Sequence, residues 1–174
     1  MKSCGIPSSR RLEEGEIIGI DVGAILNGWQ SDAARTFIVG DTTPEKKRLV
    51  NVTKESFFKG IEQFKLGNRL GDISQAIQHH AESNGFGVVR AMVGHGIGRE
   101  MHEDPQVPNF GRAGYGPKLE KGLVLAIEPM ITLGDWQVET LRDGWTCVTV
   151  DRSPSAHYEN TVALTENGIE ILTL

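Results

Sequence analysis

Four carboxylates set among apolar, strand-forming residues constrain this chain more than any other feature of its sequence. They are Asp21 in IGIDVG, Asp32 in SDAARTF, Glu128 in VLAIEPMI and Glu159 in AHYENTVAL. Aspartate and glutamate are depleted from strands and are rarely buried without a partner. Any one of them alone is more simply explained by an ion pair or a solvent-facing strand end. Four together would repel one another, so they favour a fold that gathers them around divalent cations.

Hydrophobic patterns predict an α+β fold, with an antiparallel-rich sheet and two helices on one face. The Asn27-Gly28 pair is a strong hairpin signal between two apolar runs. A helix begins at Thr43-Pro44 and runs to Gly67, and a second covers residues 72–83. The predicted strands cover residues 17–26, 29–39, 123–133, 138–141, 146–150, 158–164 and 169–172, with a short strand and a loop in 88–108.

Composition narrows the class of protein. A chain of 174 residues predicts a single domain, here residues 1–174. Two cysteines, Cys4 and Cys147, are too few for a disulfide framework, which fits a reducing compartment. The net charge of −5 with mixed signs gives no basic run for nucleic acid. No apolar run suits a membrane span or a signal peptide, so a soluble cytoplasmic protein is the simplest interpretation.

The histidines fall into two groups. His95 stands in Gly94-His95-Gly96-Ile97-Gly98, where small neighbours allow a ligand to approach closely, although a buried core histidine is the alternative. His102 follows in MHEDP and would more often be an ordinary loop residue. The remaining histidines have no such setting, and two of them are expected on the surface of the second helix. These are His79, His80 and His157.

The string GHGIGREMHEDPQVPNFG at residues 94–111 closely resembles the central motif of type I methionine aminopeptidases. Four further blocks resemble the same family, at residues 4–21, 31–40, 125–130 and 156–165. The resemblance implies the pita-bread fold, a curved antiparallel sheet with helices outside. It also implies five metal ligands in the order Asp, Asp, His, Glu, Glu. They carry over to Asp21, Asp32, His95, Glu128 and Glu159.

The resemblance also implies roles for these side chains around two divalent ions such as Co, Mn, Fe or Zn, which suit this donor set. Asp32 and Glu159 would bridge both ions, and Glu128 would also act as general base. His102 would contact the scissile carbonyl, and Met101 would line the substrate pocket. Trp145 would lie near the substrate side chain, with a core or surface aromatic as an equal alternative.

The chain departs from the family in two places. Cys4 stands where the family has a catalytic histidine, and a neutral thiol is a poor proton carrier. Only Met1 to Ser3 precede it, so these residues do not include the family's N-terminal segment. By the resemblance, that segment supplies helix and strand to one half of the fold and much of the methionine pocket, so one half is expected to be incomplete. Both departures predict lowered activity.

Three functions compete on this sequence. The first, which the sequence favours, is removal of the N-terminal methionine from nascent polypeptides at the ribosome. The second is an Xaa-Pro peptidase, which shares fold and ligands but usually has longer spacers than the one between Glu128 and Glu159. The third is a weakly active or non-catalytic metal-binding paralogue, which the change at Cys4 favours and the complete ligand set opposes.

Overall fold

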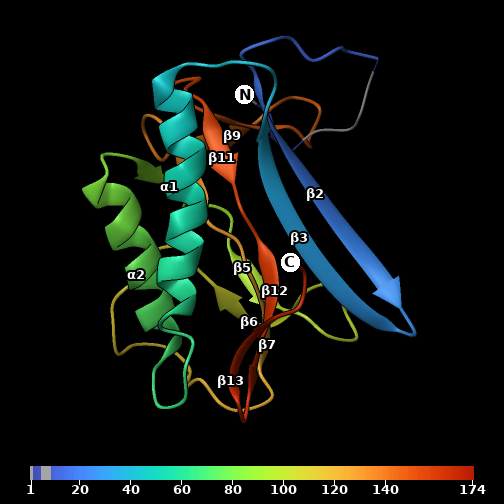
Figure 1. Ribbon diagram of the computed structural model, residues 1–174, viewed down its shortest axis with the longest axis vertical. Coiled ribbons are helices and arrows are strands. Elements are labelled where there is room, and N and C mark those ends of the chain that lie inside the picture. The colour runs from blue at the N-terminus through green and yellow to red at the C-terminus, as the bar shows by residue number, and fades with distance from the viewer. Residues whose placement is uncertain (1, 5–8) are drawn as a thin grey trace.

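The computed structural model describes residues 2–4 and 9–174, with side chains from Ser9 onward, and has the predicted α+β architecture (Figure 1). Its helices are α1 (Pro44–Ile61) and α2 (Leu70–Ser83). Its strands are β1 (Lys2–Cys4), β2 (Ile17–Leu26), β3 (Trp29–Ile38), β4 (Gly87–Val88), β5 (Gly94–Gly96), β6 (Glu103–Val107), β7 (Val124–Ile127), β8 (Met130–Thr132), β9 (Val138–Thr140), β10 (Cys147–Thr149), β11 (Ser155–His157), β12 (Asn160–Thr165) and β13 (Gly168–Ile171). Within the described ranges, neither helix is long and apolar enough to cross a membrane.

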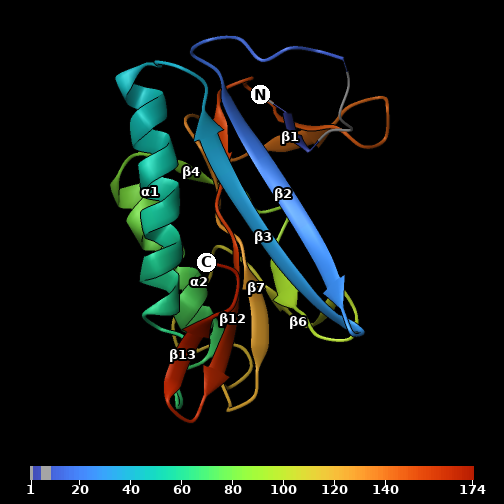
Figure 2. The same ribbon diagram turned by 45° about the vertical axis from the view of Figure 1, so that its right-hand side comes forward.

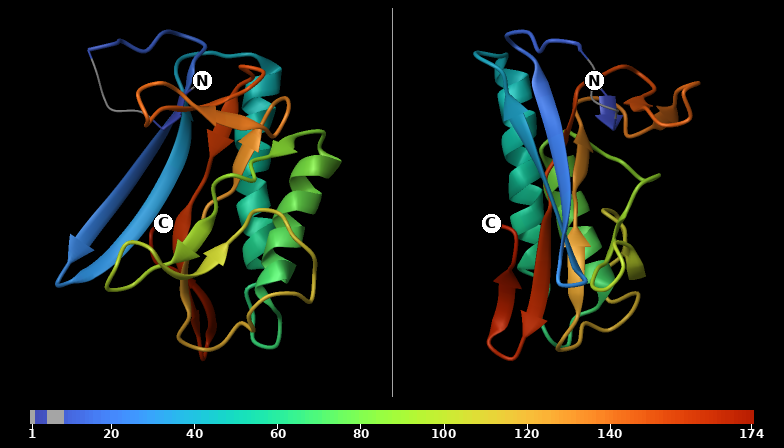
Figure 3. Two further views of the ribbon diagram at one scale, coloured as in Figure 1. Left: turned by 180° about the vertical axis from the view of Figure 1, so that it is seen from behind. Right: turned by 90° about the vertical axis from the view of Figure 1, so that its right-hand side faces the viewer.

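A five-stranded antiparallel sheet, in the order β13-β12-β7-β5-β6, forms the centre of the molecule. Both helices lie on the same side of it, as Figure 3 shows from two directions. Apolar side chains recur every three or four residues along both helices, and the stripe that they form packs on the sheet. The resulting core contains Phe57, Phe64, Ile73, Ile77, Leu125, Ile127, Val162 and Leu164, all almost fully buried. The predicted placement of two helices on one face is confirmed.

Two small sheets complete the body. Strands β11, β8 and β4 pair in that order, and Ile131 on β8 and Ala156 on β11 pack against Leu49 and Val52 of α1. Strands β1, β10 and β9 form the other, in which Cys4 lies opposite Cys147 in the ladder.

Strands β2 and β3 form a separate two-stranded hairpin that runs beside the body (Figure 2). Asn27 and Gly28 both have positive φ, at 52° and 77°, as a tight hairpin turn requires. Side chains alternate between two faces along each strand. One face carries exposed apolar side chains: Ile20, Val22, Leu26, Trp29 and Phe37. The other face carries the two aspartates.

The structure corrects four of the predicted helix and strand boundaries. Helix α1 ends at Ile61 rather than Gly67, and α2 begins at Leu70, where the Asp72 carboxylate accepts a hydrogen bond of 2.7 Å from the backbone N–H of Arg69. The predicted strand 123–133 breaks into β7 and β8 around Glu128-Pro129, because proline has no N–H to give to the ladder. The predicted strand 158–164 begins only at Asn160. Glu128 and Glu159 therefore lie at breaks between strands, not inside them.

Candidate metal centre

The hairpin supplies the two aspartates to one place. In the β2–β3 ladder Asp21 is opposite Ala34 and Asp32 is opposite Gly23, so the two carboxylates are diagonal neighbours on the same face. Asp32 is fixed by Thr161 on β12. Its backbone N–H donates to the Thr161 hydroxyl (2.9 Å), and that hydroxyl donates to the Asp32 carbonyl (2.9 Å). Asp21 is exposed and Asp32 is half-buried.

His95 reaches the same place from β5. The glycines beside it are needed because the neighbouring strands approach closely. A Cβ on Gly94 would lie 2.4 Å from the carbonyl oxygen of Ala126, and a Cβ on Gly96 would lie 2.2 Å from that of Asp104. The ring Nδ1–H donates to the Gly96 carbonyl (2.9 Å). This bond turns Nε2 toward the carboxylates, as outer-shell partners do for metal-binding histidines.

The two glutamates come from the strand breaks in the body. The Glu128 backbone carbonyl accepts a hydrogen bond of 2.9 Å from the Asn109 side chain. The Glu159 backbone N–H donates to the Ala34 carbonyl of β3 (2.9 Å), and Arg35 donates to the Glu159 carbonyl. The Glu159 side chain is 2% exposed. Loops alone would leave such carboxylates mobile, but these are anchored to β3 and to the 103–111 segment.

The five predicted ligand residues therefore lie together. His95 Nε2 is 3.9 Å from Asp32 Oδ2 and 3.7 Å from Glu128 Oε1. One donor atom each from Asp32, His95 and Glu159 falls within 4.8 Å of the others. A second group with the same property consists of Asp21, His157 and Glu159. Glu159 belongs to both groups, which is the position expected of a bridging carboxylate.

His157 corrects the sequence interpretation, which gave it no functional setting. It lies on β11 with its Nε2 3.3 Å from Glu128 Oε2 and 3.8 Å from Glu159 Oε2. The signal that could have identified it is its position two residues before Glu159. Because His157 ends β11 and Glu159 lies between β11 and β12, two-residue spacing can place both side chains on one side of the chain. His79 and His80 lie on α2, as predicted.

The electrostatics of the cluster call for positive charge. Burial, followed by the carboxylates of Glu128, Asp32 and Asp21, raises the pKa of Glu159 to about 10. Partial burial and the neighbouring Asp32 raise the pKa of Asp21 to about 6. Glu159 Oε1 and His157 Nε2 are buried and have no hydrogen-bond partner. Ligand atoms that share an ion at about 2.1 Å lie about 3–3.5 Å apart, close to the separations found here. The residues therefore fit divalent cations.

The predicted substrate residues lie on separate segments, and two of them, His102 and Met101, lie beside residues of the cluster or its hairpin. The His102 ring lies 4.3 Å from the His95 ring, centroid to centroid, and is exposed. The Met101 side chain packs over Gly23 on β2, so closely that a Cβ there would lie 2.6 Å from its terminal methyl carbon. Trp145 precedes β10 and is 61% exposed. It lines a cavity of about 330 Å³ together with Met92, Val138 and Cys147.

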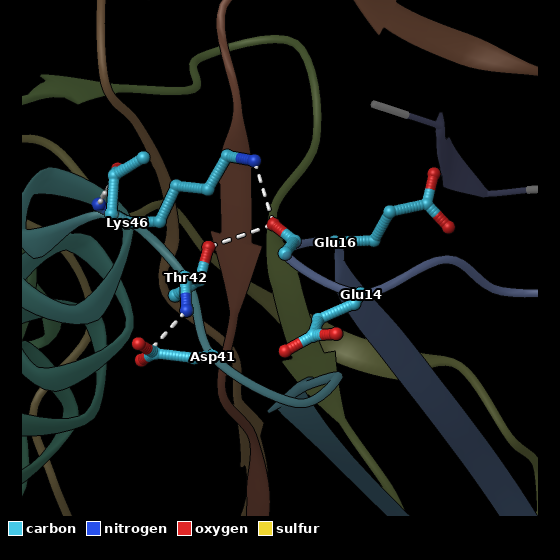
Figure 4. Close-up of a pocket in the computed structure, with 7 residues that line it drawn as sticks. Glu14, Glu16, Asp41, Thr42 and Lys46 are labelled. Carbon is cyan, nitrogen blue, oxygen red and sulfur yellow. Dashed lines mark hydrogen bonds between the residues drawn. The ribbon is translucent and has the colours of Figure 1, made fainter.

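Cys4, the departure from the family's catalytic histidine, lies on β1, but its side chain is outside the described residues. A second cavity, of about 430 Å³, lies where the start of β2 meets the start of α1 (Figure 4). Its Lys46 and Thr42 side chains both donate to the Gly15 carbonyl, at 2.8 and 2.7 Å. It contains none of the clustered ligands and is distinct from the candidate centre.

Known structures share this fold. The methionine aminopeptidase from Thermotoga maritima superposes with a TM-score of 0.91 at 56% identity, over 92% of this chain and 65% of that one. A prolidase from Pyrococcus furiosus superposes with a TM-score of 0.75 at 26% identity, over 98% of this chain and 44% of that one. The fold is therefore the predicted pita-bread fold, and the likeness is greater to the methionine aminopeptidase.

Sequence comparison gives the same assignment. A methionine aminopeptidase from Clostridium acetobutylicum is 63% identical over 171 residues, which cover 98% of this chain and 68% of that protein. The chain thus spans about two thirds of the length of this relative. The profile of metallopeptidase family M24 matches residues 2–166. The chain therefore belongs to metallopeptidase family M24, and within it to the methionine aminopeptidases.

Proposed function

We propose that this chain is a metal-dependent aminopeptidase whose reaction is the removal of methionine from the N-terminus of polypeptides. The observation that carries the proposal is the convergence of two overlapping groups of donors on the buried Glu159. The five ligands assigned to the two ions are Asp21, Asp32, His95, Glu128 and Glu159. Glu159 is common to both groups of donors, and the family resemblance assigns Asp32 to both ions as well.

When bound, two divalent ions would lower the pKa of water and polarise the scissile carbonyl. The remaining steps fall to protein side chains. Glu128 is placed among the clustered donors, where it could accept a proton, because its Oε1 lies 3.7 Å from His95 Nε2 and its Oε2 lies 3.3 Å from His157 Nε2. His102, whose ring is tilted by 57° against the ring of His95 and is open to solvent, is placed to donate a hydrogen bond to the substrate carbonyl.

The substrate side chain needs an apolar site next to the cluster. Met101 is a flexible apolar residue that already packs over Gly23, two positions from Asp21 on β2. Trp145 offers an exposed aromatic face beside a cavity of about 330 Å³. We assign both to contacts with the substrate. A polypeptide that still carries its first methionine is newly made, so we further infer a cytoplasmic location and nascent chains at the ribosome as the substrate pool.

The experiment uses the 174-residue polypeptide with Mn²⁺ or Co²⁺ and two peptides, Met-Ala-Ser and Ala-Pro. We expect release of methionine from the first and no cleavage of the second. Cleavage of Ala-Pro instead would make the protein an Xaa-Pro peptidase. Metal binding without cleavage of either peptide would make it a metal-binding protein without this activity.

Cys4 gives the proposal a sharper test. If the family's histidine is the missing proton carrier, Cys4→His should raise kcat/KM for Met-Ala-Ser, within the ~10²–10⁴-fold range typical of one acid–base group. Cys4→Ser removes the thiol without adding an imidazole and is the matched control. A wild-type rate already equal to that of Cys4→His would show that the residue at this position does not limit the reaction.

A further inference from the structure

The His157 imidazole is the least explained group in the cluster. Its side chain is 14% exposed, and its Nε2 has no hydrogen-bond partner although two carboxylate oxygens lie 3.3 and 3.8 Å away. These oxygens belong to Glu128 and Glu159. A buried polar atom without a partner is unfavourable, because it has lost its hydrogen bonds to water. A native fold keeps such an atom where it has a use, and here it faces the candidate centre.

The backbone holds His157 firmly in this position. Its ladder partner on β8 is Met130, and the Thr36 hydroxyl of β3 both donates to its carbonyl (2.9 Å) and accepts from its N–H (2.8 Å). The same strand, β3, holds the backbone N–H of Glu159. One strand therefore sets the relative position of His157 and Glu159, and the imidazole does not depend on a mobile loop for its orientation.

The two groups of donors would differ in the atom types that they offer to a metal ion if His157 were not a ligand. The group of Asp32, His95 and Glu159 already contains one imidazole nitrogen. Without His157, the other group would consist of two carboxylates alone, from the exposed Asp21 and from the shared Glu159. With His157, each group contains one imidazole and at least two carboxylates, and all the donor atoms of each group lie within 4.8 Å of one another.

We propose that His157 is a sixth protein ligand, whose Nε2 binds the ion held by Asp21 and Glu159. The inference rests on the proposed metal centre and deepens it. An imidazole in place of water makes this position more favourable to Co²⁺, Fe²⁺ or Zn²⁺ than to Mn²⁺, because nitrogen donors select borderline ions over hard ones. Both ion positions would then have mixed nitrogen and oxygen donors.

The first test is proton NMR of the Co²⁺-loaded protein, prepared in deuterated form so that only its histidines carry ordinary hydrogen. Ring protons of an imidazole bound to Co²⁺ have very large contact shifts. The number of strongly shifted sets of ring resonances therefore equals the number of histidines bound to Co²⁺. We expect two strongly shifted sets, one from His95 and one from His157. A single set in protein that binds Co²⁺ overturns the inference and leaves the five-ligand centre intact. Failure to bind Co²⁺ at all overturns both, so the two failures are distinguishable.

The second test is calorimetry on variants. His157→Gln retains an amide that can donate to Glu128 but removes the nitrogen ligand, and the exposed His79→Gln on α2 is the matched control. We expect His157→Gln to weaken Co²⁺ binding at one of two positions by at least the ~10–100-fold that loss of an outer-shell partner causes, and to weaken Mn²⁺ binding less. If His157→Gln binds both metals like the wild type while His157→Ala does not, His157 only donates a hydrogen bond to Glu128, and the proposal is wrong.

Discussion

The body and the β2–β3 hairpin contribute to the same cluster from very different surroundings. In the body, Glu159 is 2% exposed and lies among strands that pack on two helices. On the hairpin, Asp21 is exposed, and its strand β2 has β3 as its only ladder partner within residues 2–4 and 9–174. Apolar side chains differ in the same way, since Leu125 on β7 is fully buried and Leu26 on β2 is 75% exposed.

The body and the hairpin therefore hold their ligands in the shared cluster with unequal rigidity. Glu159 is buried in the body, and its backbone is hydrogen-bonded to β3, the hairpin strand that is bonded to the body, so its geometry is set before any ion arrives. Asp21 depends on a two-stranded ladder, and such hairpins are only marginally stable by themselves. We therefore expect changes in the body to affect the site more than equivalent changes on the hairpin.

The largest expected effect comes from removing the shared carboxylate. Glu159→Ala deletes a donor common to both groups, so it should weaken binding of both ions by more than ~10²-fold. Asp21→Ala deletes a donor of one group and should leave the other ion bound. Titration calorimetry with Mn²⁺ or Co²⁺ gives both affinities and the stoichiometry. Two ions still bound with wild-type affinity to Glu159→Ala would remove Glu159 from the centre.

The same contrast explains how much of the site could be predicted from sequence. Asp21 and Asp32 were placed correctly because Asn27-Gly28 fixes the hairpin turn, and alternation then fixes which side chains share a face. Glu128 and Glu159 were expected inside strands, but Pro129 and the β11–β12 break put them at strand ends. Local patterns cannot show such breaks, because they are set by pairing between distant strands.

His157 shows a second limit of sequence reasoning. Apart from its spacing of two residues from Glu159, nothing around it in SAHYEN distinguishes it from an ordinary strand histidine. Its position depends on Thr36, more than a hundred residues earlier, and on the ladder between β11 and β8. The two helices and most strands were predictable because their signals are local, whereas a contact between segments so far apart in sequence is visible only in the fold.

The next largest effect is expected from Glu128 in the body, whose proposed role is proton transfer, in comparison with Asp21 on the hairpin, whose proposed role is metal binding. Glu128→Gln keeps the size of the side chain but cannot accept a proton, so kcat on Met-Ala-Ser should fall by about 10²-fold with a smaller change in KM. Asp21→Asn should instead weaken metal binding, and its rate should recover at higher metal concentration. Steady-state kinetics across a range of Mn²⁺ tests both. An unchanged kcat in Glu128→Gln would exclude it as the base.

A smaller effect concerns the stability of the metal-free protein. The pKa of Glu159 is raised from 4.5 to about 10, so the folded protein binds this proton more tightly than the unfolded chain does. The contribution of this proton to the free energy of unfolding is therefore fully present below pH 4.5 and is lost as the pH rises toward 10. Glu159→Gln has no such proton to take up. At pH 7 with a chelator, it should raise the free energy of unfolding by about 1–3 kcal/mol.

Urea unfolding at several pH values measures this difference, which should disappear below pH 4.5. Added Co²⁺ should reverse the order, because the wild type then gains the free energy of binding and Glu159→Gln gains less. A Glu159→Gln protein that is less stable than wild type at pH 7 without metal would mean that repulsion among these carboxylates does not govern the stability of the body.

The smallest effect is expected on the outer face of the hairpin, where a matched pair of leucines gives the comparison its most direct test. Leu125→Ala should lower the free energy of unfolding by about 2–5 kcal/mol, because it leaves a cavity in a fully buried site. Leu26→Ala removes the same atoms from a side chain that is 75% exposed, so it should change stability by less than about 0.5 kcal/mol. Urea unfolding of both variants measures the two changes. A loss at Leu26 as large as that at Leu125 would mean that the hairpin face is buried in solution, and sedimentation of the wild type and of Leu26→Ala would then reveal whether a second copy covers it.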